Sequence, residues 1–201
     1  MTADPQNIKA PSTAVPIADI LANRWSPRGF DTAAVITEAE VLALLEAARW
    51  TPSASNHQPW RLIVGIRGTE DFDRVYGCLG GGNLAWASRA SALLVVVAQV
   101  LDSEGNPRLW AEYDAGQAAA SISVQAESLG LSVHQMGGFD RQQVAERFGL
   151  DDALRPMAVM AIGTFDPQAD LPEPFATREA APRKRLALDD LVLNEWPSST
   201  R

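Results

Sequence analysis

The sequence predicts an α+β fold with a mixed, mainly antiparallel sheet that is flanked by helices. The runs ALLVVVAQV (92–100) and PMAVMAIG (156–163) are apolar almost throughout, which is typical of strands buried on both faces. The predicted strands and helices mix without the strict alternation of a parallel α/β fold. Of the 201 residues, 46% are hydrophobic, so we expect one domain with a sizeable core.

The helices of the first half are indicated by their start and stop signals. Residues 16–24 begin with a proline, which is favoured at a first helical position, and carry apolar residues on one face. Thr37 and Glu40 have the spacing of a capping box, and the residues that follow, 41–50, are apolar at helical period. Pro52 is expected to end this second helix.

The remaining elements follow from small-residue and capping patterns. Residues 109–129 are rich in Ala, Ser and Gly, which predicts a long, closely packed helix with Gly130 as its left-handed cap. Asp140 and Gln143 resemble a second capping box. The other expected elements are a strand at 61–68, a loop at 77–83, a short strand at 132–139 and a helix at 140–148 that ends at Gly149.

The core is expected to lie between two less regular ends. We expect residues 1–15 to be disordered, residues 16–165 to form the core domain, and residues 166–201 to form an extended C-terminal arm of the same domain. After Gly163 the chain carries five prolines and no clear period until its last residues. Such a segment cannot build its own core, so it is either disordered or laid along another surface.

Composition excludes several classes of function. Seventeen basic residues stand against 25 acidic ones, for a formal net charge of −8, so affinity for nucleic acid or an anionic membrane is not expected. The single cysteine excludes an intrachain disulfide and a cysteine-based zinc site. With no signal peptide and no apolar run long enough to span a membrane, a cytoplasmic protein that binds no metal is expected.

The segment TPSASNHQPWRLIVG (51–65) connects a predicted helix to a predicted strand. Ser53, Asn56 and Gln58 place adaptable hydrogen-bonding groups there, and connections of this kind often carry binding residues. The same residue types also form turns by satisfying the local backbone. Taken alone, the segment leaves both interpretations open.

Taken together with four other segments, this one resembles the FMN-dependent nitroreductase family over roughly residues 16–195. That resemblance implies a three-layer α-β-α fold and a homodimer that holds FMN at the subunit interface, with residues of both chains contributing. It also implies that the C-terminal arm extends over the partner subunit. The segments are R-x-S-x-R (24–28), AARWTPSASNHQPW (47–60), GGGNLAWASRASALLVVV (80–97), SLGLSVHQMGGFD (128–140) and RKRLALDDLV (183–192).

The resemblance assigns cofactor-binding roles to eleven residues. The FMN phosphate is close to dianionic, so its site needs basic groups, preferably guanidinium forks. Arg28 would reach the pyrimidine edge of the flavin near N1 and O2, Asn56 would hydrogen-bond the polar edge of the ring, and Gly138 with Gly137 would bring backbone close to N5. The remaining roles are the phosphate or ribityl chain for Arg24, Ser26, Arg183 and Arg185, and contacts from the partner subunit for Pro52, Ser53 and Ala54.

The function implied is an FMN-dependent oxidoreductase that passes hydride from NAD(P)H, through flavin N5, to a nitroaromatic, a quinone or a related small conjugated electrophile. Because both substrates would use one pocket, ping-pong kinetics are expected. Flavin N5, supported by Arg28 and Gly138, would be the reactive centre, and no side chain is expected to act as a catalytic acid or base. Two alternatives share the motif: a protein of this fold that sequesters FMN with little turnover, and a flavin-free interaction domain.

Several other residues carry two interpretations. Trp110 and Tyr113 would line the substrate pocket or pack in a core or interface. His57 and His134 could serve acid–base chemistry, although loop exposure and core packing are the simpler roles. Two positions depart from the family pattern: Trp25 stands where a second basic residue is frequent, and Gly137 stands where some relatives have an acid.

Overall fold

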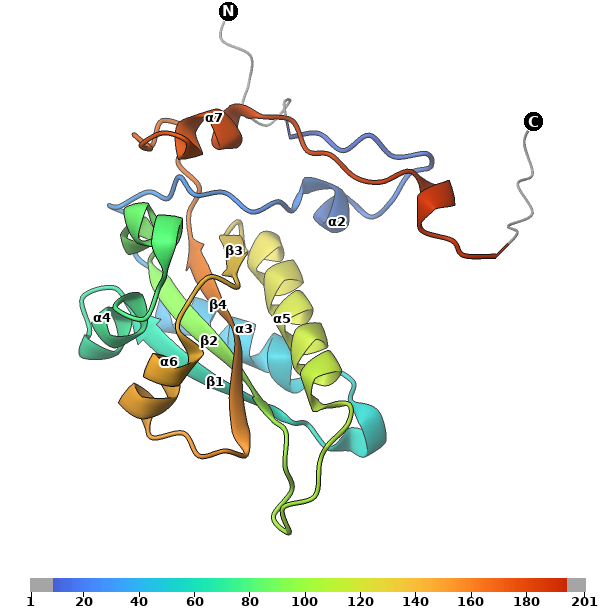
Figure 1. Cartoon of the computed structure of the whole chain (residues 1–201). Helices are drawn as coiled ribbons and strands as arrows, with labels where there is room; N and C mark the ends of the chain where they lie inside the picture. The colour runs from blue at the N-terminus through green and yellow to red at the C-terminus, as the bar shows by residue number, and fades with distance from the viewer. Residues whose placement is uncertain (1–8, 195–201) are drawn as a thin grey trace, which may run out of the picture.

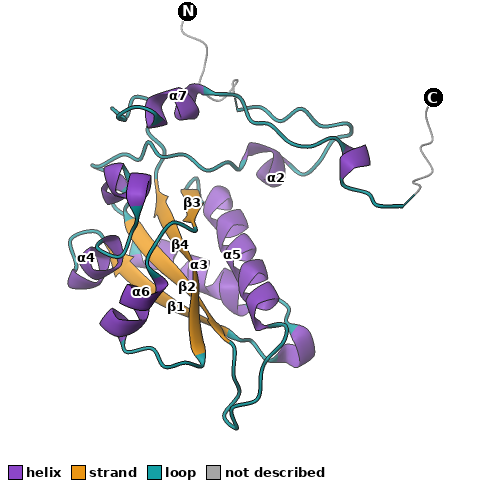
Figure 2. Cartoon of the chain, viewed as in Figure 1, coloured by secondary structure: helices purple, strands orange, loops and turns teal. Residues whose placement is uncertain are grey.

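A four-stranded antiparallel sheet forms the centre of the structure, a computed structural model that describes residues 9–194. The strands are β1 (Trp60–Ile66), β2 (Ala92–Gln99), β3 (Ser132–Met136) and β4 (Leu154–Gly163), in the order β1-β2-β4-β3 (Figure 2). Each of the three neighbouring pairs is antiparallel. The two most apolar runs of the sequence are therefore the two central strands, β2 and β4.

Helices cover both faces of this sheet, which confirms the three-layer α+β prediction (Figure 1). Helices α3 (Glu38–Arg49) and α5 (Ala111–Ser128) share one core cluster with Leu94 and Val96 of β2. Helices α4 (Glu70–Tyr76) and α6 (Arg141–Phe148) share the other cluster with Leu93 and Val95. Successive residues of a strand point to opposite faces, so β2 is apolar throughout because both of its faces are covered.

The expected capping signals are present. The Glu40 amide donates to the Thr37 hydroxyl and the Thr37 amide to the Glu40 carboxylate, so the capping box starts α3. The Asp140 carboxylate accepts from the Gln143 amide at the start of α6. Gly130 and Gly149 follow α5 and α6 with positive φ angles of 73° and 63°, as left-handed caps do.

The structure also contains elements that the sequence patterns did not predict. Helix α4 has only seven residues, too few for a helical period to be recognised, and Thr69 caps it. Helix α7 (Phe175–Ala180) lies within the arm. Helix α2 (Asp19–Asn23), by contrast, was predicted, but it is shorter than the expected 16–24. Short 3-10 helices complete the list: η1 (Ala54–Asn56), η2 (Gly81–Ala85), which begins inside the expected loop 77–83, η3 (Ala87–Arg89) and η4 (Leu188–Asp190).

The described parts of the two chain ends run together over one end of the sheet. Figure 1 shows the segment with α2 and the arm with α7 side by side along the top of the view. The Lys9 ammonium donates to the Ala181 carbonyl, and Lys9 is 8% exposed. Of the segment 1–15 that was expected to be disordered, residues 1–8 lie outside the described residues. The arm is thus laid along another surface, one of the two possibilities that its composition allowed.

Candidate cofactor site

Six basic side chains surround one cavity of about 240 Å³ between the N-terminal segment and the arm. We call this group the cation cage. The cavity inside the cage brings together all five residues to which the sequence assigned the phosphate, the ribityl chain or the pyrimidine edge of the flavin. The cavity is lined by Lys9, Arg24, Trp25, Ser26, Arg28, Arg178, Ala181, Pro182, Arg183 and Arg185.

Arg183 ties the arm to the end of α2. Its guanidinium donates to the carbonyl of Arg24, at 2.8 Å, and to the carbonyl of Ala22, two groups that the helix end leaves free. Burial lowers the pKa of Arg183, and the neighbouring Arg185 and Arg24 lower it further. The buried Nε of Arg183 has no hydrogen-bond partner among the described residues. A bound anion would supply an acceptor and relieve this crowding of like charges, so the cage fits a phosphate group.

Arg28 is held by two rings and one carboxylate. Its guanidinium lies 5.9 Å from the ring centroid of Trp86 and 5.8 Å from that of Phe175, within the range of cation–π attraction. Its Nη1 lies 3.8 Å from Oε2 of Glu179, a residue of α7. Trp86, which lies between η2 and η3, and two residues of α7 therefore hold the cation that the sequence assigned to the pyrimidine edge of the flavin.

His134 packs against Trp86, one of the two rings that hold Arg28. Its Nδ1 lies 3.0 Å from the carbonyl oxygen of Pro27, and its ring centroid lies 4.6 Å from that of Trp86. Burial, and then the charge of Arg28, lowers the pKa of His134 to about 4. The neutral form is therefore the native one, which agrees with the core-packing interpretation.

This histidine is expected to make stability depend on pH. The unfolded chain takes up a proton near pH 6.5 whereas the native chain takes one up near pH 4, so stability is lost as the pH falls between these values. The loss approaches roughly 3 kcal/mol at the lower end. Urea unfolding from pH 7 to pH 4 checks it, and His134→Gln should flatten this part of the curve. An equal slope in both proteins would show that His134 titrates normally.

The loop at 51–58 is held in a strained conformation by α5. The amide of Ala54 donates to the carboxylate of Asp114, which is 2% exposed, and the hydroxyl of Thr51 donates to Ser121. Three non-glycine residues of the loop have positive φ angles: Ser55, Asn56 and Gln58, at 50°, 55° and 48°. Such conformations persist only where their surroundings enforce them, and they are concentrated at binding and active sites.

Within one chain, the loop and the cation cage stand apart. The loop contacts Asp114 near the start of α5, whereas the charges of Arg24 and Arg183 act on Glu127 near its end. Thirteen residues of helix correspond to about 20 Å. Pro52, Ser53, Ala54 and Asn56 are therefore not brought to the cage of their own chain.

The glycine pair lies nearer the cage, at the end of β3. The Gly138 carbonyl accepts from the amide of Gly80 and from the side chain of Asn83, both at 3.0 Å. Gly82 lies between Gly80 and Asn83, and a Cβ added there would meet the ring of Phe175 at 2.5 Å. This contact places the loop that contains Gly82 against the ring that covers Arg28. A Cβ at Gly137 would meet nothing within 4 Å, so its backbone stays approachable.

Trp110 and Tyr113 are exposed at the start of α5, with ring centroids 6.2 Å apart in an edge-to-face contact. Trp110 lines a cavity of about 290 Å³ together with Ala54, Ser55 and His57, so it adjoins the strained loop. Tyr113 does not line this cavity. Because both side chains are exposed, neither one packs in the core of the single chain.

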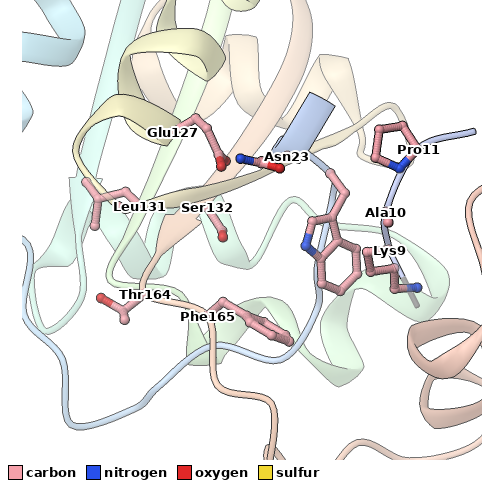
Figure 3. A pocket seen from close by; sticks show the side chains of 11 residues that line it. Lys9, Ala10, Pro11, Asn23, Glu127, Leu131, Ser132, Thr164 and Phe165 are labelled. Carbon is pink, nitrogen blue, oxygen red and sulfur yellow. The ribbon is translucent and has the colours of Figure 1, made fainter. Parts of the chain in front are cut away.

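A larger cavity, of about 610 Å³, adjoins the cage and shares Lys9 and Trp25 with it. Figure 3 shows the side-chain ends of Glu127 and Asn23 turned toward one another, and Ser132 lines the same cavity. Burial raises the pKa of Glu127, whereas Arg24 and Arg183 lower it. The larger cavity thus carries one carboxylate and one ammonium, whereas six basic groups and no acid line the smaller one.

Among residues 9–194, no helix is both long and apolar enough to cross a membrane. That part of the chain also contains no cluster of three or more His, Cys, Asp or Glu side chains that could hold a metal ion. Cys78 is buried, and burial raises the pKa of its thiol.

Comparison with known proteins decides the family. A sequence model described as "Nitroreductase family" matches residues 21–78 and 78–164, more than half of the chain. The chain belongs to the nitroreductase family. This match ends before the arm, so Arg178, Arg183 and Arg185 of the cage lie beyond it.

Individual relatives extend this finding. The chain is 40% identical over 140 residues to a 15.4 kDa protein of Mycolicibacterium smegmatis, covering 66% of this chain and 93% of the relative. It is 24% identical over 182 residues to YdgI of Bacillus subtilis (strain 168), which is named as a candidate NAD(P)H nitroreductase. That match covers 72% of this chain and 86% of the relative. A crystal structure described as an oxidoreductase containing FMN superposes with a TM-score of 0.86 at 35% identity, covering 94% of this chain and 96% of that one.

Trp25, one of the two departures from the nitroreductase-family pattern, has a structural explanation. It packs edge-to-face against Phe165, with ring centroids 5.2 Å apart, and the Lys9 ammonium lies 4.5 Å from the centroid of its ring. Lys9 also lines the cation cage. A basic group therefore reaches the cage from the N-terminal segment instead of from position 25.

Four residues at or near the site were missed by sequence reasoning. Lys9 fell in a segment that was expected to be disordered. Arg178 and Glu179 lie on α7, which has only six residues and is therefore too short for a helical period to be recognised. Asp114 lies among the small residues of α5, where no pattern separates a buried carboxylate from a solvated one.

Proposed function

We propose that the protein is an FMN-dependent oxidoreductase that uses NAD(P)H to reduce nitroaromatics, quinones or related small conjugated electrophiles. The cation cage carries this proposal, because it concentrates six basic groups and an unpaired buried Nε in a chain with a net charge of −8. The FMN-containing structure with 35% identity supports the choice of cofactor. The name of the Bacillus subtilis relative supports the choice of reductant.

Different residues of the chain would have different roles in binding the cofactor. Arg24, Ser26, Arg183 and Arg185 would hold the phosphate and the ribityl chain, and Lys9 and Arg178 add charge to the same cavity. Arg28 would stabilise negative charge at N1 and O2, and the backbone at Gly137 and Gly138 would address N5. When bound, FMN would supply the two-electron chemistry between NAD(P)H and the acceptor, for which ping-pong kinetics are expected. The protein binds, orients and stabilises charge, and it needs no acid or base of its own.

The same proposal requires a homodimer. Because the loop lies about 20 Å along α5 from the cage of its own chain, Pro52, Ser53, Ala54 and Asn56 would reach the flavin of the partner subunit. The arm is suited to cover a partner, since four of its leucines are exposed: Leu186, Leu188, Leu191 and Leu193. Exposed Trp110 and Tyr113 would then lie near the mouth of the shared pocket.

We expect a dimer in solution, with about twice the chain mass of 21.6 kDa by light scattering at micromolar concentration. A dimer buries the apolar surface of the arm and completes each site with a second loop. Arm truncation after Pro182 is expected to shift the protein toward monomer and to release FMN. A full-length monomer that retains FMN would contradict the assignment of the loop to the partner.

Turnover is tested by steady-state oxidation of NADPH or NADH with menadione or a nitrofuran as acceptor. The proposal predicts consumption of the pyridine nucleotide that depends on the acceptor, with the parallel double-reciprocal lines of ping-pong kinetics. A flavin-loaded protein that consumes neither nucleotide with any acceptor would instead be a flavin-sequestering protein of this fold.

A further inference from the structure

We propose that Glu179 is a positioning residue that holds Arg28 and lowers the reduction potential of the flavin. This inference rests on the proposed binding of FMN in the cation cage. Glu179 belongs to α7 of the arm, whereas Arg28 belongs to the segment before α3. A residue 151 positions away in the sequence would therefore fix the position of Arg28 and offset its charge.

The first observation is that Glu179 fixes the backbone of the flavin-facing segment. Its Oε1 accepts from the amide of Arg28 at 2.8 Å and from the amide of Gly29 at 2.9 Å. The space around Gly29 is also full, since a Cβ there would meet the Asp166 carbonyl at 2.8 Å and the Ala169 side chain at 2.9 Å. The path of the chain after Ser26 is thus determined by the arm.

The second observation concerns charge. The ten residues that line the cation cage include no acid. Among the ion pairs of the described residues, the pair of Arg28 with Glu179 is the one that involves a cage cation. The Glu179 side chain is 14% exposed, and its Oε2 accepts no hydrogen bond within the described part of the chain. A full negative charge therefore stands 3.8 Å from the Arg28 guanidinium with little water to screen it.

The consequence follows from the charge that reduction adds. Reduced flavin carries negative charge at N1 and O2, and Arg28 would favour it there. Glu179 opposes this effect, because a carboxylate beside the cation repels the same developing charge. The reduced flavin is then held less tightly relative to the oxidised form, which keeps it a stronger reductant toward the acceptor.

Glu179→Gln tests the role of the charge. The amide oxygen of glutamine can still accept from the two backbone amides, while the negative charge is gone. The midpoint potential of bound FMN should rise, with a roughly tenfold higher ratio of affinities for reduced over oxidised flavin, equivalent to about 30 mV for a two-electron couple. Potentials are measured by anaerobic spectroelectrochemistry against a reference dye, and flavin occupancy is measured from absorbance.

Two further variants separate charge from structure. Glu173→Gln is the matched control, because Glu173 is an exposed carboxylate of the same arm that contacts the Thr177 hydroxyl, and its potential should equal that of the wild type. Glu179→Asp keeps the charge but shortens the side chain, so it should lower the melting temperature of the protein while leaving the potential close to the wild-type value.

The outcomes distinguish this inference from the proposed function. A raised midpoint potential of bound FMN in Glu179→Gln, but not in Glu173→Gln or Glu179→Asp, supports the role of Glu179. Flavin-loaded Glu179→Gln with an unchanged potential would overturn the role of Glu179 and leave the proposed function standing, as would an equal shift in Glu179→Asp. Wild-type protein that shows no flavin absorbance and takes up no added FMN would overturn the proposed function, and this inference with it.

Discussion

Replacing Arg28 with alanine is expected to weaken FMN retention or slow flavin reduction by about tenfold to hundredfold. The guanidinium would make a charge-assisted contact with the flavin, and the loss of such a contact is equivalent to roughly 1.5–3 kcal/mol. The guanidinium lies 5.9 Å from the ring centroid of Trp86 and 5.8 Å from that of Phe175, so its position is held by cation–π contacts. FMN release on dilution, followed by flavin fluorescence, and anaerobic stopped-flow reduction by NADPH measure the two effects.

Lys184→Ala provides the control with the same loss of charge. Lys184 stands between Arg183 and Arg185 in the sequence but is exposed and does not line the cation cage. Its variant should retain FMN as the wild type does. If Arg28→Ala keeps full flavin occupancy and an unchanged half-reaction, the flavin ring has been placed wrongly.

Trp86→Ala is expected to destabilise the fold by about 3–5 kcal/mol, the usual loss for a large buried aromatic side chain. Trp86 is 0% exposed, and its ring centroid lies 6.3 Å from that of Phe30 and 4.6 Å from that of His134. Removal of the indole leaves a cavity under Arg28 and His134 as well as a loss of apolar burial. Urea unfolding of the flavin-free protein measures the change, and the Arg28 site should lose FMN in parallel.

Trp86→Phe supplies the graded comparison. The indole Nε1 of Trp86 is buried and has no hydrogen-bond partner among the described residues, so phenylalanine removes an unsatisfied donor as well as some volume. Its effect should be well below that of alanine. Equal destabilisation by both substitutions would mean that a hydrogen bond of the indole, and not its packing, holds this region.

The sheet was predictable because its signal is local. Strand β2 is apolar at every position but the last, and it lies between β1 and β4 with helices on both faces. The capping residues Thr37 and Asp140 also act within four residues of themselves, so their patterns identify helix starts. Helices α4 and α7 were missed because seven and six residues contain too few apolar positions to show a period.

The candidate site was predictable only where a motif covers it. The segment R-x-S-x-R indicated Arg24, Ser26 and Arg28, and the cavity brings them together. The placement of the arm depends on contacts such as that of Lys9 with Ala181, 172 residues apart, which no local pattern encodes. The positive φ angles of Ser55 and Asn56 were likewise invisible, since non-glycine residues adopt them only under tertiary constraint.

Whether the protein binds a reducible flavin is tested by its visible absorption spectrum before and after anaerobic addition of NADPH. We expect a yellow protein with the two visible bands of oxidised flavin, both of which bleach on addition of the nucleotide and return in air. A purified protein without flavin bands, even after incubation with FMN, would contradict the assignment of the cation cage. Flavin bands that neither NADPH nor NADH bleaches would contradict the oxidoreductase function.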